Sequence, residues 1–467
     1  MKGIRFIFFF FLLAKTQGEV QLTVYNQNLG LVREERKINL RAGIQEVKFT
    51  DVAANIDATS VHFQSLTAPN EAVVLEQNFE YDLVSRDKLL EKYIDKEIEI
   101  LRRFGVSGEK SEVLKGKLLS TKGGLTVKVG DQIYLNPSGE IILSKLPEGL
   151  VTKPTLSWFI DCTKPGEHKV EVSYLTSGIN WNADYVVVSD KDDKSISLNG
   201  WVTIENKSGA TYQDAKLKLI AGDIHRVSPP SAVREYDLYA ERKALAAPQF
   251  EEKPFFEYHM YTLQRKTTIR DNETKQIEFA SASHVPVKKL LIYDGARMPF
   301  YGYSEYSRAD QRYGTQSQKK VYVMLEFKNT KENNLGIPLP KGKMRVYKED
   351  TDKSLQFIGE DWIDHTPKDE IVRIYLGDAF DLVGERVQTD FKMGGDWVLE
   401  SYKITIRNHK EEPVTVRVVE HLYRWSNWKI VEKSQDYEKK DSRTIEFNLP
   451  VPKNGEGVIT YTVRYWW

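Results

Sequence analysis

Residues 321–327 read VYVMLEF, and this stretch carries the pattern that decides the fold. Apolar side chains stand at every second position, at Val321, Val323, Leu325 and Phe327. Because successive side chains of a strand point to opposite faces, this alternation predicts a strand with one buried face. The same period of two recurs along most of the chain, for example over residues 20–24, 170–174, 414–418 and 445–449. The sequence therefore predicts an all-β protein built from two antiparallel β-sandwich domains.

Residues 86–148 depart from this pattern of long strands. Over residues 86–95 the apolar side chains recur with helical spacing, and Ser85 can cap the first turn, which predicts one short helix. Between residues 97 and 143, five short alternating runs follow one another, joined by Gly-rich turns. That spacing is typical of a small closed barrel of the SH3 or Sm type. We expect this barrel to be inserted in the first sandwich.

The pattern changes along the chain give the expected domain boundaries. A loop is expected at 225–258, where four prolines interrupt the alternation, and we expect it to be mobile. The expected parts are a signal peptide (1–18), an N-terminal sandwich in two pieces (19–94 and 149–293), the inserted barrel (95–148), a linker (294–318) and a C-terminal sandwich (319–467).

Composition and charge exclude several classes of protein. The chain has 467 residues, 40% of them apolar, which is too apolar for a disordered protein. It carries 67 basic and 67 acidic side chains, so no basic field favours nucleic acid. The single cysteine, Cys162, excludes an internal disulfide and a Cys-rich metal site.

The first eighteen residues, MKGIRFIFFFFLLAKTQG, have the features of an export signal. Lys2 and Arg5 precede a short apolar run, and small residues stand at Thr16 and Gly18. The apolar run is about half the ~20 residues that a membrane-spanning helix needs. We therefore predict cleavage before Glu19 and an exported mature chain in the periplasm or at the cell surface.

Eight ordered strings along the chain resemble one family of bacterial exported proteins. They are VYNQNLGLVRE (24–34), VLEQNFEYDLVS (74–85), YLTSGINWNADY (174–185), GWVTIENKSGATYQDAKLKLIAGD (200–223), EYHMYTL (257–263), NETKQIEF (272–279), LGIPLPKGKMRVYKED (335–350) and GEDWIDHTPKDE (359–370). The C-terminal module of these proteins is a domain of unknown function, number 4139, and some longer relatives are labelled mucoidy-inhibitor-like. The resemblance implies a β-rich envelope protein and implies no activity.

The densest group of polar residues lies at 349–370 and includes Asp361, Asp364, His365 and Glu370. If this stretch folds back on itself, a carboxylate could pair with His365 as acid and base, which makes these the candidate catalytic residues of a hydrolase. The alternative is a turn at 366–369 in which the acids bind nearby backbone amides. We favour the turn and assign no residue as catalytic.

Two further stretches offer a candidate metal site and a candidate nucleophile. Asp350 and Asp352 resemble the start of a calcium loop, but Lys353 stands where the similar proteins tend to have Gly and would bring a positive charge to the ion. We therefore favour a tight turn there and assign no metal ligand. Cys162 lies between a predicted strand and a Lys-Pro-Gly turn, where a lone thiol is expected to be inert.

The nine tryptophans offer a different kind of site, because exposed aromatic rings can stack on sugars. Trp425 and Trp428 flank a Ser-Asn turn, so we expect this pair to be exposed. Together with Arg424 they are the candidate ligand-binding residues. The alternative is that they belong to a sandwich core, where Trp is common.

These observations predict a non-enzymatic binding or structural module of the cell envelope. Its partner is unknown, with an envelope protein or a glycan as candidates, and we expect no nucleic acid, no cofactor and no transmembrane span. A hydrolase that uses the 349–370 cluster is the first alternative. A protein associated with the outer membrane is the second, since residues 459–467 alternate and end on an aromatic residue, as outer-membrane barrels commonly do.

Overall fold

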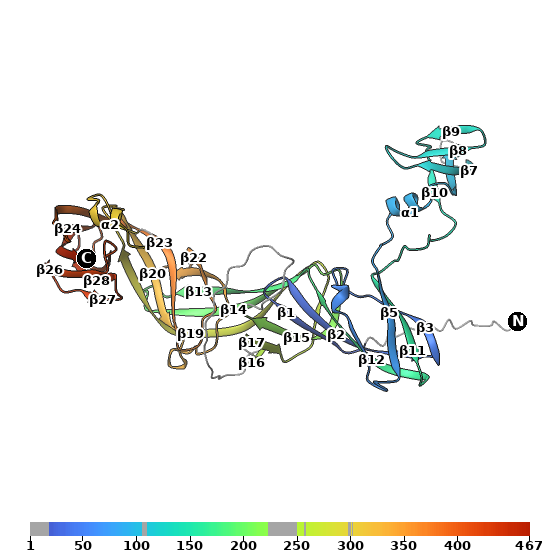
Figure 1. The fold of residues 1–467 in the computed structure, drawn as a ribbon, viewed down its shortest axis with the longest axis horizontal. Coiled ribbons are helices and arrows are strands. Elements are labelled where there is room, and N and C mark those ends of the chain that lie inside the picture. The colour runs from blue at the N-terminus through green and yellow to red at the C-terminus, as the bar shows by residue number, and fades with distance from the viewer. Residues whose placement is uncertain (1–17, 105–109, 223–249, 256–257, 298–299, 301) are drawn as a thin grey trace. The chain divides into compact units, whose positions relative to one another are not determined.

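The computed structural model describes residues 18–104, 110–222, 250–255, 258–297, 300 and 302–467 (Figure 1). Nearly all regular structure in these residues is extended, with 29 strands against two short α-helices and two 3-10 helices. The all-β fold predicted from the alternation is therefore confirmed, while the division into sandwiches stays a prediction. Among the described residues, no helix is both long enough and apolar enough to cross a bilayer.

Both α-helices begin at a serine whose hydroxyl accepts a backbone hydrogen bond. α1 (Arg86–Lys92) lies in the segment predicted as helical, and Ser85 accepts from the amide of Lys88. The sequence pattern did not predict α2 (Glu305–Ala309), which begins after Ser304 in the stretch expected as a linker. Single 3-10 turns form η1 (Ala58–Ser60) and η2 (Lys331–Asn333).

The chain divides into two compact units, each formed by separate stretches of sequence. The first comprises the residues up to Trp181, Ile204–Ile220 and Thr262–Lys275, and the second comprises Asn182–Thr203, Ala221–Tyr261 and Gln276–Trp467.

Two sheets of the first unit pack around a buried tryptophan. The larger has the strand order β15-β1-β2-β12-β4, with β18 beside β15, and the smaller has the order β3-β11-β5. The bounds are β1 (Val20–Tyr25), β2 (Leu29–Leu40), β3 (Gly43–Thr50), β4 (His62–Ser65), β5 (Ala72–Glu80), β11 (Thr155–Cys162), β12 (Gly166–Thr176), β15 (Tyr212–Ala221) and β18 (Thr267–Ile269). The ring of Trp158 on β11 lies 5.5 Å from that of Phe49 on β3 and 5.1 Å from that of Phe63 on β4. The buried faces of the two sheets therefore meet at Trp158.

The region predicted as a small barrel contains the five expected strands. They are β6 (Glu97–Phe104), β7 (Lys110–Ser120), β8 (Thr126–Val129), β9 (Gln132–Leu135) and β10 (Glu140–Ile142), in the order β10-β6-β7-β8-β9. Ile100, Leu118 and Val127 are fully buried and pack with Leu90 of α1. Closure of this sheet into a barrel stays a prediction.

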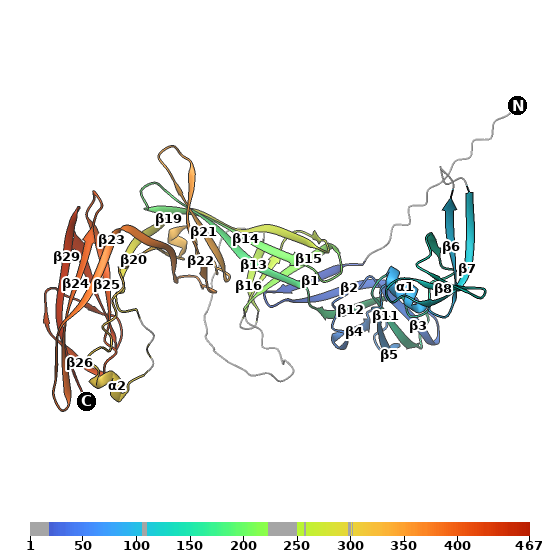
Figure 2. The same cartoon turned by 90° about the horizontal axis from the view of Figure 1, so that it is seen from above.

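One large sheet runs through the second unit in the order β22-β21-β13-β14-β19-β20-β23-β24-β29-β26, and β25 pairs with β19 and β28. The bounds are β13 (Ile179–Ser189), β14 (Ser195–Asn206), β19 (Glu273–Tyr293), β20 (Lys320–Lys328), β21 (Gly342–Glu349), β22 (Leu355–Ile363), β23 (Ile371–Met393), β24 (Trp397–Asn408), β25 (Val414–His421), β26 (Asn427–Lys433), β27 (Glu438–Lys439), β28 (Thr444–Val451) and β29 (Gly455–Trp466). β24 and β29 pair over their full length (Figure 2). The core between β23, β24, β25, β28 and β29 is apolar, with Phe447 and Ile459 fully buried.

The loop expected at 225–258 is corrected at its C-terminal end. β16 (Phe250–Phe255) occupies part of it, and β17 (Tyr258–Leu263) begins at its last residue. Phe250 is buried, so these residues contribute an apolar side chain to the core despite the neighbouring prolines. Residues 225–249 of the expected loop lie outside the described residues.

Three strands end in the same way, at a buried asparagine. β14 ends at Asn206, β20 is followed by Asn329 and β24 ends at Asn408. Each side-chain amide donates to two backbone carbonyls, and each amide oxygen accepts a backbone N–H further along the chain. The carbonyls are those of Ala210 and Arg270 for Asn206, Ile337 and Pro367 for Asn329, and Glu412 and Pro452 for Asn408, at 2.7–3.0 Å.

The chain also continues in the same way after each asparagine. The next strand pairs in parallel with an earlier one, β15 with β1, β21 with β13 and β25 with β19. Each asparagine thus joins the end of one strand to the crossover that follows it. The structure therefore contains a threefold repeat that the sequence shows only as the short strings VTIEN, LEFKN and ITIRN.

Candidate functional site

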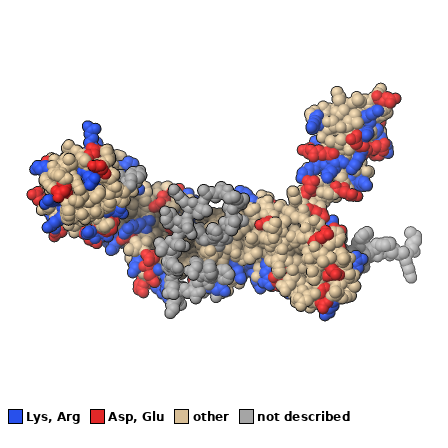
Figure 3. Space-filling view, viewed as in Figure 1, with Lys and Arg blue, Asp and Glu red and all other residues tan. Residues whose placement is uncertain are grey.

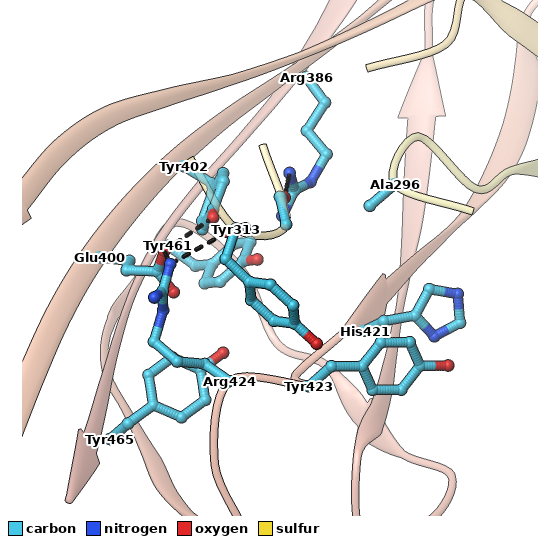
Figure 4. A pocket seen from close by; sticks show the side chains of 11 residues that line it. Ala296, Tyr313, Arg386, Glu400, Tyr402, His421, Tyr423, Arg424, Tyr461 and Tyr465 are labelled. Atoms are coloured by element: carbon cyan, nitrogen blue, oxygen red, sulfur yellow. Dashed lines mark hydrogen bonds and ion pairs between the residues drawn. The ribbon is translucent and has the colours of Figure 1, made fainter. Parts of the chain in front are cut away.

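Two ion pairs lie inside the apolar core of the second unit. Figure 4 shows Arg386 of the first pair and Arg424 with Glu400 of the second. Arg386 of β23 donates from Nε to both carboxylate oxygens of Glu420 on β25, at 3.0 and 2.9 Å. Arg424, just after β25, donates from Nη2 to Glu400 of β24 at 2.6 Å. All four side chains are at most 3% exposed. This is the densest cluster of buried ionisable groups among the described residues.

Tyrosines complete the cluster and supply hydrogen bonds to the carboxylates. Tyr402 donates to Glu400 at 3.0 Å, and Tyr461 donates to Glu420. Burial, followed by the nearby carboxylate, raises the pKa of each of these tyrosines, so both hydroxyls keep the proton that they donate. Burial by itself would lower the pKa of Arg386, but the charge of Glu420, the neighbouring Tyr461 and Tyr402 and the hydrogen bond to Glu420 together raise that pKa. The site therefore holds two hydrogen-bonded ion pairs with tyrosine donors beside them.

Terminal guanidinium nitrogens of the two arginines hold a segment of backbone against the sheet. Five carbonyl oxygens between α2 and residue 314 accept from the two arginines. They belong to Ser307, Arg308, Asp310 and Tyr313 for Arg424 and to Gly314 for Arg386, at 2.6–3.2 Å. The stretch 294–318 was expected as a linker, and these contacts show that part of it is fixed to the core.

A small cavity opens beside the cluster and is lined by His421 and Tyr423 as well as by Arg386, Glu400 and Arg424. His421 Nε2 lies 3.1 Å from both carboxylate oxygens of Asp294, which is the geometry of an acid–base pair. The cavity has a volume of about 10 Å³, no larger than one water molecule needs. The described cavity therefore offers space for about one water molecule beside His421.

Sequence reasoning missed Arg386, Glu400 and Glu420 because they stand within apolar patterns. Glu400 lies between the buried Val398 and Tyr402 on one face of β24, and Glu420 continues the buried face of β25 after Val418. A carboxylate on the apolar face of a strand needs a buried partner. A glutamate at an apolar position of a strand was therefore the available signal for a buried ion pair, although it does not identify the partner.

The structure distributes the 349–370 residues over a strand and the turn that follows it. Asp361 of β22 accepts from two backbone amides, those of Trp362 and Tyr375, each at 2.8 Å. His365 accepts through Nδ1 from the amide of Lys341 at 3.1 Å. The carboxylate of Asp361 thus joins β22 to β23, and the imidazole of His365 supports the chain before β21.

The other two candidate acids of this stretch contribute through their backbone. The carbonyl of Asp364 accepts from the hydroxyl of Thr366 at 2.8 Å, and the carbonyl of Glu370 accepts from the amide of Asn329 at 2.8 Å. Both side chains are exposed. The backbone of Asp364 therefore stabilises a turn, and that of Glu370 stabilises the end of a strand.

Asp350 and Asp352 lie in the turn between β21 and β22. Asp350 accepts from the amide of Thr351 at 2.6 Å, and Asp352 accepts from that of Ser354 at 2.8 Å. Hydrogen bonds from Ser354 lower the pKa of Asp352. Lys353 has a φ of 68°, the left-handed region that favours glycine. Within the described ranges, no three His, Cys, Asp or Glu side chains are grouped to hold a metal ion.

The expected exposure of the Trp425–Trp428 pair is corrected. Arg424 is buried in the ion cluster described above, because Glu400 and four backbone carbonyls satisfy its charge. Trp425 is half-buried against the core, with the Arg308 guanidinium 5.0 Å from its ring. Trp428 is also half-buried and donates through Nε1 to the carbonyl of Ser442 at 2.8 Å.

Cys162 lies in a buried polar cluster of the first unit. His168 Nε2 donates to the carbonyl of Lys164 at 2.7 Å, and Nδ1 accepts from the hydroxyl of Ser65 at 2.8 Å. The thiol lies 3.8 Å from His168 Nε2 and donates to the same carbonyl. Cys162, His168 and Ser65 are at most 2% exposed, so this Ser-His-Cys arrangement has no access to a substrate.

Comparison with known proteins assigns the chain to a family. A family described as a domain of unknown function (DUF4139) matches residues 170–467, which include the three asparagine corners and both buried ion pairs. No curated protein matches the chain. The match covers well over half of the sequence and agrees with the resemblance found in its strings. The chain therefore belongs to the family of the domain of unknown function DUF4139.

Proposed function

We propose that the protein is an exported component of the cell envelope that binds a partner or has a structural role and catalyses no reaction. The best support comes from the hydrogen-bond partners of the buried arginines and glutamates. The guanidinium and carboxylate groups of the ion cluster bind one another and the 307–314 backbone, and the adjoining cavity holds no more than a water. Such a cluster fixes the fold of the core.

The hydrolase alternative is tested with His365→Ala beside His409→Ala. We expect His365→Ala to lower the melting temperature, because it leaves the Lys341 amide without its acceptor, a loss of about 1–3 kcal/mol for a partly buried group. His409 is exposed and its side chain makes no hydrogen bond in the described part of the chain, so His409→Ala should melt like the parent protein.

Esterase, glycosidase and peptidase substrates give the decisive readout for the same variants. The parent protein and both variants should turn over none of these substrates. Turnover by the parent that His365→Ala abolishes, with an unchanged melting temperature, would support the hydrolase and contradict the proposal.

Export predicts a defined mature N-terminus. When the full chain is produced in a bacterium, mass spectrometry of the periplasmic fraction should find Glu19 as the first residue. Gly18→Leu should block this cleavage, because the signal peptidase needs a small side chain before the cut. Protein that stays in the cytoplasm with Met1 or Lys2 at its start would overturn the export proposal.

A further inference from the structure

The outward face of the sheet β3-β11-β5 mixes exposed apolar side chains with carboxylates. Trp158 and Phe49 mark the inward face, so the alternate side chains of these strands point outward. The register places Ile44 and Val73 on either side of Asp161, and Glu46 and Glu76 on either side of Phe159. The apolar members of this face are Ile44, Val73 and Phe159, with 65, 53 and 37% of their surface exposed, and Leu75, 52% exposed, stands beside them at a bulge of β5. Ile44 and Val73 thus flank an acid in one row across the strands, and Phe159 stands between two acids in the next row.

Two carboxylates that lack ion-pair partners stand among these apolar side chains. The outward positions of the three strands carry the acids Glu46, Glu76, Glu80 and Asp161 and the single base Lys48. Lys48 pairs with Glu46 at 3.6 Å and with Glu80 at 3.4 Å. Glu76 and Asp161 make no ion pair among the residues that the structure describes, and both stand beside the apolar side chains. The surface over this sheet in Figure 3 is mainly uncharged, broken chiefly by acidic groups.

We infer that this face is a docking surface for a protein partner that presents aliphatic side chains flanked by lysine or arginine. Removing the apolar side chains of Ile44, Val73, Leu75 and Phe159 from water would contribute favourable free energy of binding. The charges of Glu76 and Asp161 then select a basic border on the partner. This inference rests on the binding role proposed above and gives the chemistry of the partner.

The same charges disfavour the other occupants of an apolar face. Two copies of this chain that met face to face would bring Glu76 and Asp161 of one copy against the carboxylates of the other. An anionic lipid surface or a nucleic acid would be repelled in the same way. A basic partner is the one macromolecular surface that satisfies both the apolar side chains and the unpaired acids.

A labelled peptide of alternating lysine and valine serves as the probe, with a glutamate–valine peptide for comparison. The full mature chain should bind the lysine peptide, less tightly as salt is added, and hydrogen exchange should slow in β3, β11 and β5. Reversing two charges with Glu76→Lys/Asp161→Lys should weaken binding by at least about tenfold. Removing apolar surface with Ile44→Ser/Leu75→Ser should weaken it to a similar degree.

The control makes the same change of charge at a distance from this face. Glu112→Lys/Asp131→Lys alters exposed acids of the β6–β10 sheet and should leave binding unchanged. The melting temperature of each variant is measured alongside, and it should stay close to that of the parent, because the altered side chains are exposed or, at Asp161, half-exposed. Equal loss in the control, equal binding of the glutamate peptide, or a dimer that Ile44→Ser/Leu75→Ser dissolves would overturn the inference. Export and the absence of turnover would be unaffected by that result, so the proposed function is tested separately.

Discussion

Arg386→Met is expected to lower the free energy of unfolding by about 3–5 kcal/mol, because it leaves the carboxylate of Glu420 buried without its partner. Glu420 is fully buried, and apart from Arg386 its described donor is the hydroxyl of Tyr461. The same change also frees the carbonyl of Gly314, which Arg386 holds at 2.6 Å. Chemical denaturation of the mature chain measures the loss as a lower midpoint.

The double variant Arg386→Met/Glu420→Leu separates the cost of an orphaned charge from the value of the pair. Replacing both charges with apolar side chains removes the uncompensated carboxylate, so it should recover much of the stability lost in the single variant. Arg407→Met serves as the surface control, because Arg407 and Glu385 form a partly exposed pair, and it should change the midpoint little. A double variant that is as unstable as Arg386→Met would show that the carboxylate is not the cause.

Asn408→Asp is the second substitution with a large expected effect. The side-chain amide of Asn408 donates to the carbonyls of Glu412 and Pro452, at 2.9 and 3.0 Å, in a site that is 1% exposed. An ionised aspartate has the same shape but cannot donate, and it places a negative charge against two carbonyl oxygens. We expect a loss of about 3 kcal/mol or more in the free energy of unfolding.

Denaturation of two further variants tests the reason for this loss. Asn408→Ala removes the donor without adding charge and should be less harmful than Asn408→Asp. Asn448→Asp, at an exposed position of β28, should be nearly neutral. Equal midpoints for Asn408→Asp and Asn448→Asp would contradict the role given to the asparagine corner. Because Asn206 and Asn329 make the same contacts, their Asp variants should behave like Asn408→Asp.

The sequence by itself determined that the fold is all-β. Alternation such as that of residues 321–327 depends only on side chains of one strand, which are close in sequence and report directly whether one face is buried. Local spacing also located the five short strands of β6–β10 and the helix α1 with its cap at Ser85. These features all depend on neighbours within a few residues.

Only the tertiary structure decided which polar groups share a site. Arg424 contacts the carbonyl of Ser307, 117 positions earlier, and the turn at 426–427 beside it favoured exposure. Asn329 likewise joins the carbonyls of Ile337 and Pro367, and nothing in the string LEFKN specifies the second of these. A buried charge or amide is stabilised by whichever partners the sheet register brings to it. That register is set by strands far apart in the sequence, which is why the core cluster and the asparagine repeat could not be read from local pattern.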